Sequence, residues 1–292
     1  MRKNNGFVFL LPCLFPLVCL AAESRPRLVS LAPSLTEMVF ALGAGSLLAG
    51  VSENCRYPPE ARDIPKIGLY LTPNYEIILT LRPDLVLMLA EHAPARPALE
   101  ALGLAYEVFD HRRLAGLLES FSRLGGICGA QERAGELRAE VESAFLRPAP
   151  TPGTTPPNIL VVLGRDYGVG GIANAYVIGK DDLYNQLIEA VGCRNAYRGD
   201  LAYPVLSGES IASLSPDIVI ETVFAEMGTA IPNRDLLRDW SSSLANLQAV
   251  REGRVFYLRN DYIFVPGHRL VLLKRDLAAI VRQAFPGLLA PP

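Results

Sequence analysis

Residues 76–87 read EIILTLRPDLVL, and residues 209–220, 133 positions later, read ESIASLSPDIVI. In both copies a glutamate opens a short helix, apolar residues three apart give it one buried face, and a proline ends it. The strand that follows is apolar at consecutive positions, which is typical of a strand covered on both faces. The spacing is too long for a solenoid repeat. The repeat therefore predicts two similar α/β lobes, each with a glutamate at the same place.

Further apolar runs alternate with helical patterns on both sides of the repeat. Strands are predicted at 28–32, 48–51, 85–89, 106–109, 159–163, 218–222 and 255–258, and helices at 35–42, 99–102, 114–124, 183–191 and 270–285. Ser34 is the expected N-cap of the first helix. A series of this kind implies a mostly parallel sheet covered by helices on both sides.

The two series are separated by a charged helical stretch at 130–147 and a segment rich in proline and threonine at 148–157. The fold class is thus α/β, with two Rossmann-like lobes, each around a central parallel sheet, joined by one long α-helix. We expect an N-terminal lobe at 23–128, the connecting helix and proline-rich linker at 129–157, and a C-terminal lobe at 158–292. A single helix resists bending, so we expect the lobes to open and close only slightly.

The first 22 residues are expected to be a cleaved export signal. Arg2 and Lys3 precede an apolar stretch at 7–20 that ends in Ala21-Ala22. A positive start, an apolar centre and small residues at the end are typical of a secretory signal, with cleavage after Ala21 or Ala22. The stretch is shorter than the ~20 residues of a membrane span, so stable insertion in the membrane is not expected. Lipidation at Cys19 stays open, although Val18 stands where a small residue is usual.

About 270 residues remain after cleavage, enough for two ordinary domains. The net charge of −2 and the lack of a basic stripe argue against a nucleic-acid surface. The remaining cysteines are Cys55, Cys128 and Cys193. A Cys55–Cys128 disulfide inside the first lobe and three buried, apolar thiols are both compatible with the sequence.

At this point three segments resemble a known family. These are RLVSLAPSLTE at 27–37, GVSENCRYPPEA at 50–61, and PNYE at 73–76 with the following LRPDLV at 81–86. They resemble periplasmic binding proteins that serve ABC importers for cobalamin, ferric siderophores and haem. The resemblance covers essentially the whole chain after the signal, and the segment 50–59 is most similar to the cobalamin-binding branch. It implies an exported, monomeric protein that presents a bulky ligand to a permease dimer and carries no cofactor of its own.

The resemblance implies a role for the repeated glutamates. In such proteins one glutamate from each lobe pairs with arginines of the two permease subunits, and Glu76 and Glu209 match these positions by motif. A carboxylate and a guanidinium can form a charge-assisted, bidentate pair. The alternative is local. With Asn74 and Ser207 as N-caps, each glutamate lies in a first helical turn, where the helix dipole favours an acid without any partner.

Candidate ligand-binding residues lie where the carboxyl ends of the strands face the cleft. By their motif offsets, Tyr70, Tyr203 and Tyr262 resemble aromatic positions that stack on the corrinoid in cobalamin-binding members. Cys55, Tyr57, Tyr176 and Arg165 are further candidates on the same edge. Aromatic faces suit a large flat ligand because they bury much area at little entropic cost. Loop tyrosines also cap core edges, so either role is open for each of them.

Other functions have weaker support in the sequence. Haem would use His92 or His268 as axial ligand and Arg56, Arg165 or Arg259 for its propionates, and a ferric siderophore would also use arginines and aromatics. A zinc or manganese site needs clustered ligands, and the chain has only three histidines. The glycines at 168–171 and Gly179-Lys180-Asp181 lack the spacing of nucleotide-binding motifs. An enzyme would rest on Cys55 with a distant histidine, so we expect no catalytic activity; a secreted scaffold protein is the remaining alternative.

Overall fold

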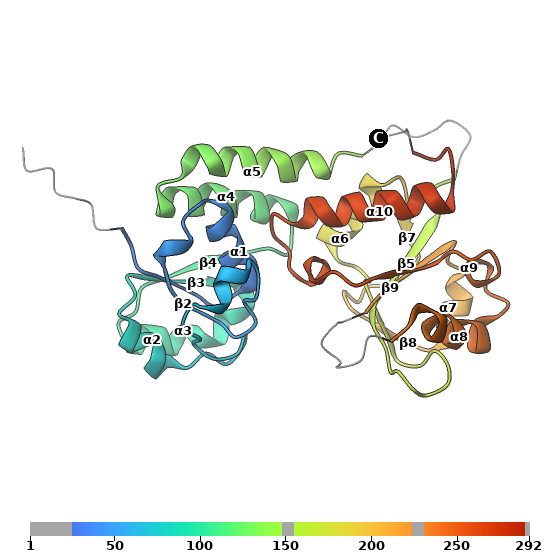
Figure 1. Cartoon of the computed structure of the whole chain (residues 1–292), viewed down its shortest axis with the longest axis horizontal. Coiled ribbons are helices and arrows are strands. Elements are labelled where there is room, and N and C mark those ends of the chain that lie inside the picture. Colours follow the sequence, from blue (N-terminus) through green and yellow to red (C-terminus); the bar gives the residue numbers. More distant parts are fainter. Residues whose placement is uncertain (1–24, 148–154, 224–230, 290–292) are drawn as a thin grey trace, which may run out of the picture.

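The computed structural model describes residues 25–147, 155–223 and 231–289, so the expected signal at 1–22, with Cys19, lies outside the described residues (Figure 1). The proline-rich segment is described only from residue 155. Within the described ranges no helix has the length and apolar character needed to cross a membrane.

The first lobe is built on four parallel strands in the order β2-β1-β3-β4. The strands are β1 (Leu28–Ser30), β2 (Leu48–Val51), β3 (Leu85–Leu89) and β4 (Tyr106–Phe109). Around them lie α1 (Pro33–Ala41), α2 (Tyr75–Leu81), α3 (Arg96–Ala101), α4 (Leu114–Cys128) and the short 3-10 helices Gly45–Leu47, Pro59–Arg62 and Ala90–Ala95. Figure 1 shows α1 and α4 on one side of this sheet and α2 and α3 on the other.

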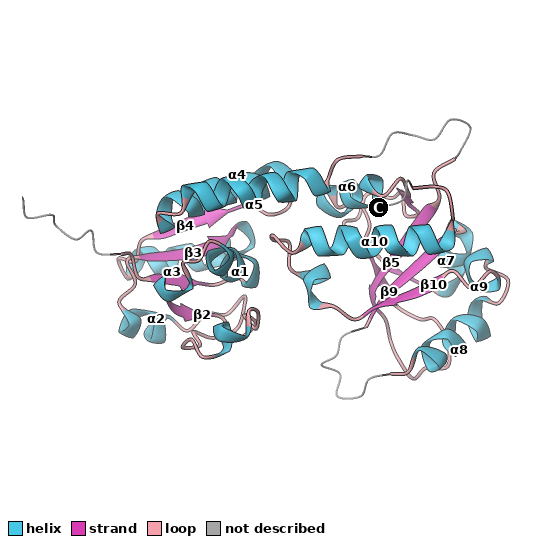
Figure 2. Cartoon of the chain, turned by 45° about the horizontal axis from the view of Figure 1, so that its top comes forward, coloured by secondary structure: helices cyan, strands magenta, loops and turns pink. Residues whose placement is uncertain are grey.

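The second lobe has a mixed sheet in the order β10-β9-β5-β6-β8, with β7 paired to β5. Its strands are β5 (Asn158–Gly164), β6 (Ala175–Val177), β7 (Arg194–Asn195), β8 (Val205–Leu206), β9 (Ile218–Thr222) and β10 (Val255–Leu258). Its helices are α6 (Asp182–Ala190), α7 (Gly208–Leu214), α8 (Asn233–Leu244), α9 (Gln248–Arg251), α10 (Leu270–Ala284) and the 3-10 helix Asp261–Phe264. Strands β5, β9 and β10 pair in parallel and lie side by side in Figure 2. Strand β7 also pairs in parallel with β5, whereas β6 pairs antiparallel with both β5 and β8.

Consecutive strand residues enter different cores because side chains alternate across a sheet. Leu87 of β3 joins the buried cluster that contains α1 and α4, while its neighbour Val86 packs with α2 and α3. In the second lobe Ile220 faces α6 and α10, and Val219 faces α7 and α8. The consecutive apolar residues of the repeat are therefore explained by burial on both faces, as predicted.

The two copies of the repeat share their local structure in detail. Asn74 caps α2 by accepting from the Ile77 N–H at 3.1 Å, and Ser207 caps α7 in the same way at 3.2 Å. Each helix ends at a left-handed residue, Arg82 (φ +47°) or Ser215 (φ +46°). The proline follows directly, so the chain leaves each helix sharply and enters a central strand.

The aspartate of each copy fixes the neighbouring strand. Asp84 accepts the Arg27 N–H at 2.7 Å immediately before β1, and Asp217 accepts the Asn158 N–H at 2.8 Å at the start of β5. A carboxylate that accepts a backbone N–H forms a strong, charge-assisted hydrogen bond. The motif therefore positions both the strand that follows it and the strand beside it.

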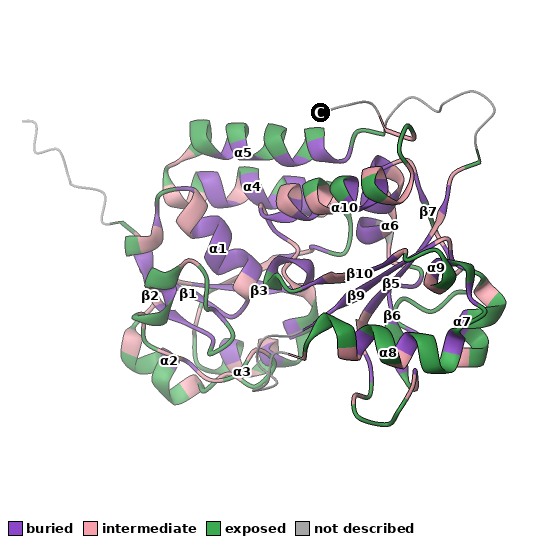
Figure 3. Cartoon of the chain, turned by 45° about the vertical axis from the view of Figure 1, so that its right-hand side comes forward, coloured by how far each residue is buried: buried purple, intermediate pink, exposed green. Residues whose placement is uncertain are grey.

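The connecting helix is α5 (Gln131–Ala144), slightly shorter than the predicted 130–147. It packs along α4 and also contacts α10 of the second lobe (Figure 1). Ala134, Leu137, Val141 and Ala144 form its buried stripe, and its outer surface is exposed (Figure 3). The predicted two-lobed α/β fold joined by one helix is confirmed.

One local prediction was wrong. Ser34 does not cap α1; the N-cap is Ala32, and Ser34 lies buried inside the helix. Pro33 occupies the first helical turn, where its missing N–H costs nothing and its fixed φ suits a helix. The helix therefore starts earlier than the serine suggested.

The left-handed end of α2 gives a stability prediction. A residue with a side chain pays about 1–2 kcal/mol in this conformation, which glycine avoids at some entropic cost. Arg82→Gly should therefore raise the free energy of unfolding by about 0.5–1 kcal/mol, measured by urea denaturation. The same exchange at exposed Arg138 inside α5 should lower it by about 1 kcal/mol. A loss of similar size at both positions would contradict this account of α2.

Candidate functional site

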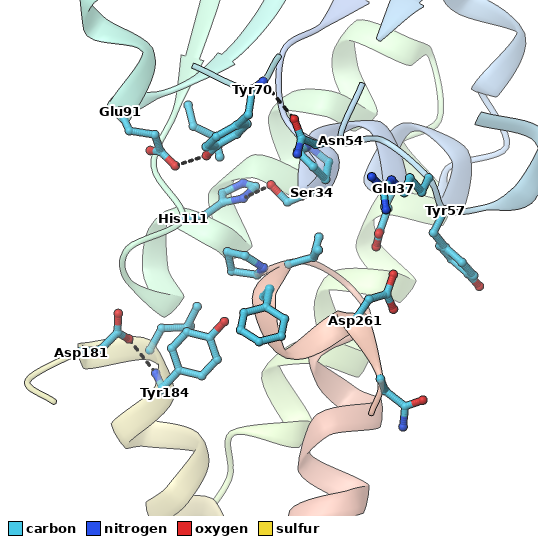
Figure 4. A pocket seen from close by; sticks show the side chains of 18 of the residues that line it. Ser34, Glu37, Asn54, Tyr57, Tyr70, Glu91, His111, Asp181, Tyr184 and Asp261 are labelled. Atoms are coloured by element: carbon cyan, nitrogen blue, oxygen red, sulfur yellow. Dashed lines mark hydrogen bonds between the residues drawn. The ribbon is translucent and has the colours of Figure 1, made fainter. Parts of the chain in front are cut away.

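A cavity of about 520 Å³ lies between the two lobes, with walls from both (Figure 4). In the first lobe it is lined by residues of α1 and of the loops that follow the carboxyl ends of β2 to β4. In the second lobe it is lined by residues after β9 and β10, at the start of α6, and by Tyr203 just before β8. Open α/β sheets bind ligands beyond the carboxyl ends of their strands. The position of the cavity is thus the one that the topology favours for a ligand.

Aromatic and apolar side chains form much of the wall. Tyr57 and Tyr70 come from the first lobe and Tyr203 from the second, and Leu89, Leu183, Tyr184, Phe264 and Pro266 add apolar surface. Tyr57 is 40% exposed and Tyr203 is 50% exposed. Rings with this much free surface can bury a large area of a bound molecule.

Two of these tyrosines are held by acidic partners. The Tyr70 hydroxyl donates to Glu91 Oε1 at 2.5 Å, and the Tyr203 hydroxyl donates to Asp181 Oδ2 at 2.6 Å. Burial, and then the hydrogen bond to the carboxylate, raises the pKa of both phenols. Both side chains therefore remain protonated at physiological pH and keep their rings fixed against the cavity.

His111 is a buried, neutral part of the wall. Its Nδ1 lies 3.0 Å from Ser34 Oγ and its Nε2 lies 3.1 Å from Ser120 Oγ. Burial lowers the pKa of His111 to about 4. Both ring nitrogens are engaged, so this histidine shapes the wall without presenting a free nitrogen to the cavity.

An ion pair between the lobes borders the cavity. Arg269, just before α10, donates to both carboxylate oxygens of Glu37 on α1, with the Nε–Oε2 distance at 2.7 Å, and to Asp261 Oδ1 at 2.7 Å. Its guanidinium carbon lies 4.1 Å from the ring centre of Tyr57. Glu37 and Arg269 are 2% and 5% exposed, so water screens this pair little.

The cavity also carries arginines that already have partners. Arg112 pairs with Asp110, with Nε to Oδ1 at 2.8 Å. Arg259 donates to Asn233 Oδ1 at 2.7 Å and to the Ile231 carbonyl at 2.6 Å. Since Asn233 and Ile231 are uncharged, the positive charge of Arg259 is less compensated by these bonds than that of Arg112.

The structure brings three of the seven predicted ligand-binding residues to the cavity, namely Tyr57, Tyr70 and Tyr203. The other four lie elsewhere. Tyr262 is buried, with its hydroxyl bonded to Asp276 and Asn260, and Tyr176 is 51% exposed on β6, between β5 and β8.

The side chains of Arg165 and Cys55 are buried inside their lobes and contact partners there. The side chain of Arg165 is fully buried and bonds to Glu221 and Asp239 at 2.9 Å each, and Glu221 also accepts from the only tryptophan, Trp240, at 2.7 Å. Cys55 is fully buried within hydrogen-bond distance of Thr36 and Ser52. All three described cysteines are free thiols, so the Cys55–Cys128 disulfide considered above is not formed in this structure.

The histidines considered as haem ligands also lie outside the cavity lining. His92 is buried and accepts the Leu89 N–H with its Nδ1 at 3.2 Å, while its Nε2 lies 2.9 Å from the Tyr70 carbonyl. Burial lowers the pKa of His268 to about 4. Within the described part of the chain, no group of three or more histidine, cysteine or acidic side chains is arranged to hold a metal ion.

The repeated glutamates lie away from the cavity on equivalent surfaces of the lobes. Glu76 is exposed in the first turn of α2, and Glu209 is exposed in the first turn of α7. Apolar side chains lie exposed nearby in the sequence, including Leu71 and Ile77 in the first lobe and Val205 in the second. Each lobe thus presents an exposed acid with exposed apolar residues close to it in the sequence.

Sequence reasoning missed Glu37, His111, Asp181 and Arg269 as members of this region. Asp181 lies in the Gly179-Lys180-Asp181 segment, whose pattern suggests only an incomplete nucleotide motif, and it follows an antiparallel strand where the carboxyl-end rule gives no signal. Glu37 and Arg269 are 232 residues apart, and neither the repeat nor the periodicity links them.

Comparisons with known sequences and with solved structures agree on one kind of protein. A family model described as periplasmic binding protein matches residues 28–262. The Bacillus subtilis ABC transporter substrate-binding lipoprotein YvrC, itself uncharacterized, is 26% identical over 86% of this chain and 78% of its own length. A vitamin B12-binding protein of Pectobacterium carotovorum is 27% identical over 93% of this chain and 94% of that protein. The structure of the periplasmic heme-binding protein RhuT from Roseiflexus sp. RS-1 superposes with a TM-score of 0.72 at 25% identity, covering 89% of this chain and 98% of RhuT.

The ion pair between the lobes gives a pH prediction. Burial raises the pKa of Glu37 from 4.5 to about 7, against the opposing hydrogen bonds and charge of Arg269. Between pH 4.5 and about 7 the folded chain therefore binds a proton at Glu37 that the unfolded chain has released. The stability that this proton confers is fully present below pH 4.5 and is lost as the pH rises to about 7. Glu37→Gln should remove about 1–3 kcal/mol of this pH dependence, measured by urea denaturation at several pH values.

The control is Glu136→Gln, which alters an exposed pair with Arg133 on α5. It should leave the pH profile as in the wild type. A Glu37→Gln profile in which stability declines more steeply with rising pH than in the wild type would mean that Arg269 lowers the pKa of Glu37 below its ordinary value, which is the opposite of our account.

Proposed function

Since the chain belongs to the periplasmic binding protein family, we propose that it captures a corrinoid, cobalamin first, in the cavity between its lobes and delivers it to the permease of an ABC importer. Proteins of this family bind solutes for import and do not transform them. The proposal thus concerns reversible binding followed by transfer to a membrane partner.

The observation that carries this proposal is the set of tyrosines around the cavity. Tyr57 and Tyr70 from one lobe and Tyr203 from the other lie at the same cavity, with exposed ring surface between two rigid sheets. Large, flat molecules gain affinity from such surfaces because the rings lose little side-chain entropy on binding. Similarity to a vitamin B12-binding protein along almost the whole chain supports the same choice.

The polar groups of the cavity favour a corrinoid over haem. Haem iron needs an axial histidine or tyrosine ligand from the protein. The phenols of Tyr70 and Tyr203 have raised pKa values and donate to carboxylates, and both nitrogens of His111 are engaged. Tyr57 remains as the cavity tyrosine that could reach haem iron, with its ring against the Arg269 guanidinium. Cobalamin carries its own axial ligands, so a protein can bind it through a complementary cavity shape and hydrogen bonds alone.

Haem is the second candidate because arginines line the cavity, including Arg56 and Arg259, which the sequence suggested for the propionates. Arg259 is exposed there and its bonds with Ile231 and Asn233 leave its charge uncompensated, so it could receive a propionate. The fold likeness to a heme-binding protein is compatible with this reading. A ferric siderophore would use the same arginine and the same rings.

We further propose that the permease is recognised through Glu76 and Glu209. Both acids are exposed, occupy the same turn of equivalent helices, and lie one on each lobe. Two-fold symmetric permease subunits could each receive one of them through a bidentate arginine pair. Residues 1–22 would be the cleaved export signal, and the lobes at 23–128 and 158–292, joined through 129–157, would act as one monomer.

Charge reversal at the docking acids should separate delivery from capture. In the Glu76→Lys/Glu209→Lys variant we expect at least about a tenfold loss of cobalamin uptake through the cognate importer, with ligand affinity within about twofold of the wild type. Uptake would be measured with labelled cobalamin and affinity by equilibrium dialysis. Glu140→Lys, on the exposed face of α5, is the control and should leave both unchanged. Loss of affinity in a folded Glu76→Lys/Glu209→Lys protein would instead mean that these acids act in ligand binding.

Two equally exposed tyrosines test the ligand site. Tyr203 is 50% exposed at the cavity, and Tyr176 is 51% exposed but outside it. Tyr203→Ala should weaken cyanocobalamin binding by about tenfold or more, because a ring that packs on the ligand is lost. Tyr176→Ala should leave the dissociation constant within about twofold. Equal effects of the two substitutions in dialysis would contradict the proposed position of the ligand.

A further inference from the structure

The two tyrosine–carboxylate pairs of the cavity occupy corresponding positions in the lobes. Tyr70 lies six residues before Glu76, and Tyr203 lies six residues before Glu209, so both follow from the repeat. Each donates its hydroxyl to an acid from a neighbouring loop, Glu91 at 2.5 Å or Asp181 at 2.6 Å. All four side chains line the cavity.

The two pairs also lie close to each other across the cavity. Burial, the hydrogen bond to Asp181 and its charge raise the pKa of Tyr203, and the charge of Glu91 from the other lobe contributes as well. Glu91 and Asp181 lie on the same side of the cavity, one from each lobe (Figure 4). A ligand on this side would meet both pairs at once.

Each tyrosine–carboxylate pair can accept hydrogen bonds from a ligand but cannot donate them. The phenol proton is committed to the carboxylate, so the phenol oxygen can only accept, and the ionised carboxylate has further lone pairs but no donor. Asp181 has one more bond, from the Tyr184 N–H at 2.9 Å, and still retains free lone pairs. This side of the cavity therefore offers acceptors and negative charge from both lobes.

We infer that these pairs select ligands whose facing rim donates hydrogen bonds, as primary amides do, and reject ligands that present carboxylates there. A carboxylate would place like charges together and leave acceptors facing acceptors, both of which cost binding energy. The inference rests on the proposed capture of a corrinoid, whose ring carries a rim of acetamide and propionamide groups. The two pairs would thus recognise the side chains at the edge of the corrin ring, whereas aromatic stacking recognises only its flat face.

Three arginines line the cavity, Arg56, Arg112 and Arg259, and they offset this preference only in part. Arg112 is paired with Asp110, and Arg259 donates hydrogen bonds to Asn233 and to the Ile231 carbonyl. Arg269 is engaged by Glu37 and Asp261. None of these hydrogen bonds involves Glu91 or Asp181. The hydrogen bond and charge of Asp110, and then the charge of Glu91, raise the pKa of Arg112. Arg112 therefore offsets part of the negative charge on this side of the cavity, while Asp181 still faces the ligand with its charge.

A matched pair of corrinoids tests the inference. Dicyanocobyrinic acid carries carboxylates on its rim, and its heptaamide carries primary amides on the same ring. The wild-type protein at pH 7.5 should bind the heptaamide about 100-fold more tightly or better, as measured by calorimetry. In the Glu91→Gln/Asp181→Asn variant the ratio of the two affinities should fall by about tenfold. The glutamine and asparagine side chains carry no negative charge and can donate hydrogen bonds to a carboxylate of the ligand.

The variant is designed to keep the fold. The Glu91→Gln exchange retains a side-chain oxygen that can accept from the Tyr70 hydroxyl, and asparagine is as good an N-cap for α6 as Asp181. Thermal unfolding checks that the variant remains folded before any binding is compared.

The matched control is Glu100→Gln. Tyr106 donates its hydroxyl to Glu100 at 2.6 Å in the same kind of pair, away from the cavity. This substitution should leave the ratio of the two dissociation constants unchanged.

The outcomes separate this inference from the proposed function. A wild-type protein that binds neither cyanocobalamin nor the heptaamide overturns the proposed function, and the inference with it. A protein that binds cyanocobalamin but shows the same amide-to-carboxylate ratio in the Glu91→Gln/Asp181→Asn variant as in Glu100→Gln keeps the function and overturns the inference. A fall in the ratio confined to the cavity variant is the expected result.

Discussion

The ion pair between Glu37 and Arg269 is the contact on which the arrangement of the lobes depends. It joins α1 of the first lobe to the start of α10 in the second, is almost fully buried, and places Asp261 and Tyr57 at the edge of the cavity. Losing Arg269 would leave the buried Glu37 carboxyl without its hydrogen-bond donors, which costs more than the loss of an exposed pair. The helix α5 keeps the lobes connected, whereas this pair fixes how they face each other across the ligand site.

The repeat explains why both lobes present similar chemistry to that site. Each copy caps its helix, ends it in a left-handed residue and uses an aspartate to position the neighbouring strand. The tyrosine six residues before each glutamate then lies at the cavity, while the glutamate lies on the outer surface. One local structure therefore serves two roles in each lobe, with the ligand on one side and the surface proposed for the permease on the other.

Much of the fold could be predicted because it depends on local patterns. The strands at 85–89 and 218–222 follow from consecutive apolar residues after a proline, and the observed bounds agree with them. The short antiparallel strands β6 and β8 were not predicted, since two or three residues carry no periodicity. At the site, Tyr70 and Tyr203 follow from the repeat, but Arg165 and Tyr262 do not line the cavity because each satisfies acidic partners inside its own lobe. The Glu37–Arg269 pair depends on the packing of segments 232 residues apart, which a single sequence does not encode in any local pattern.

The central claim is that the cavity between the lobes binds a corrinoid. Calorimetric titration of the purified protein, without its signal segment, with cyanocobalamin and then with haemin under the same conditions tests it most directly. The account predicts tight one-to-one binding of cyanocobalamin, with a negative heat-capacity change from the apolar surface that the tyrosines bury. Tight binding of haemin with no heat from cyanocobalamin would contradict it.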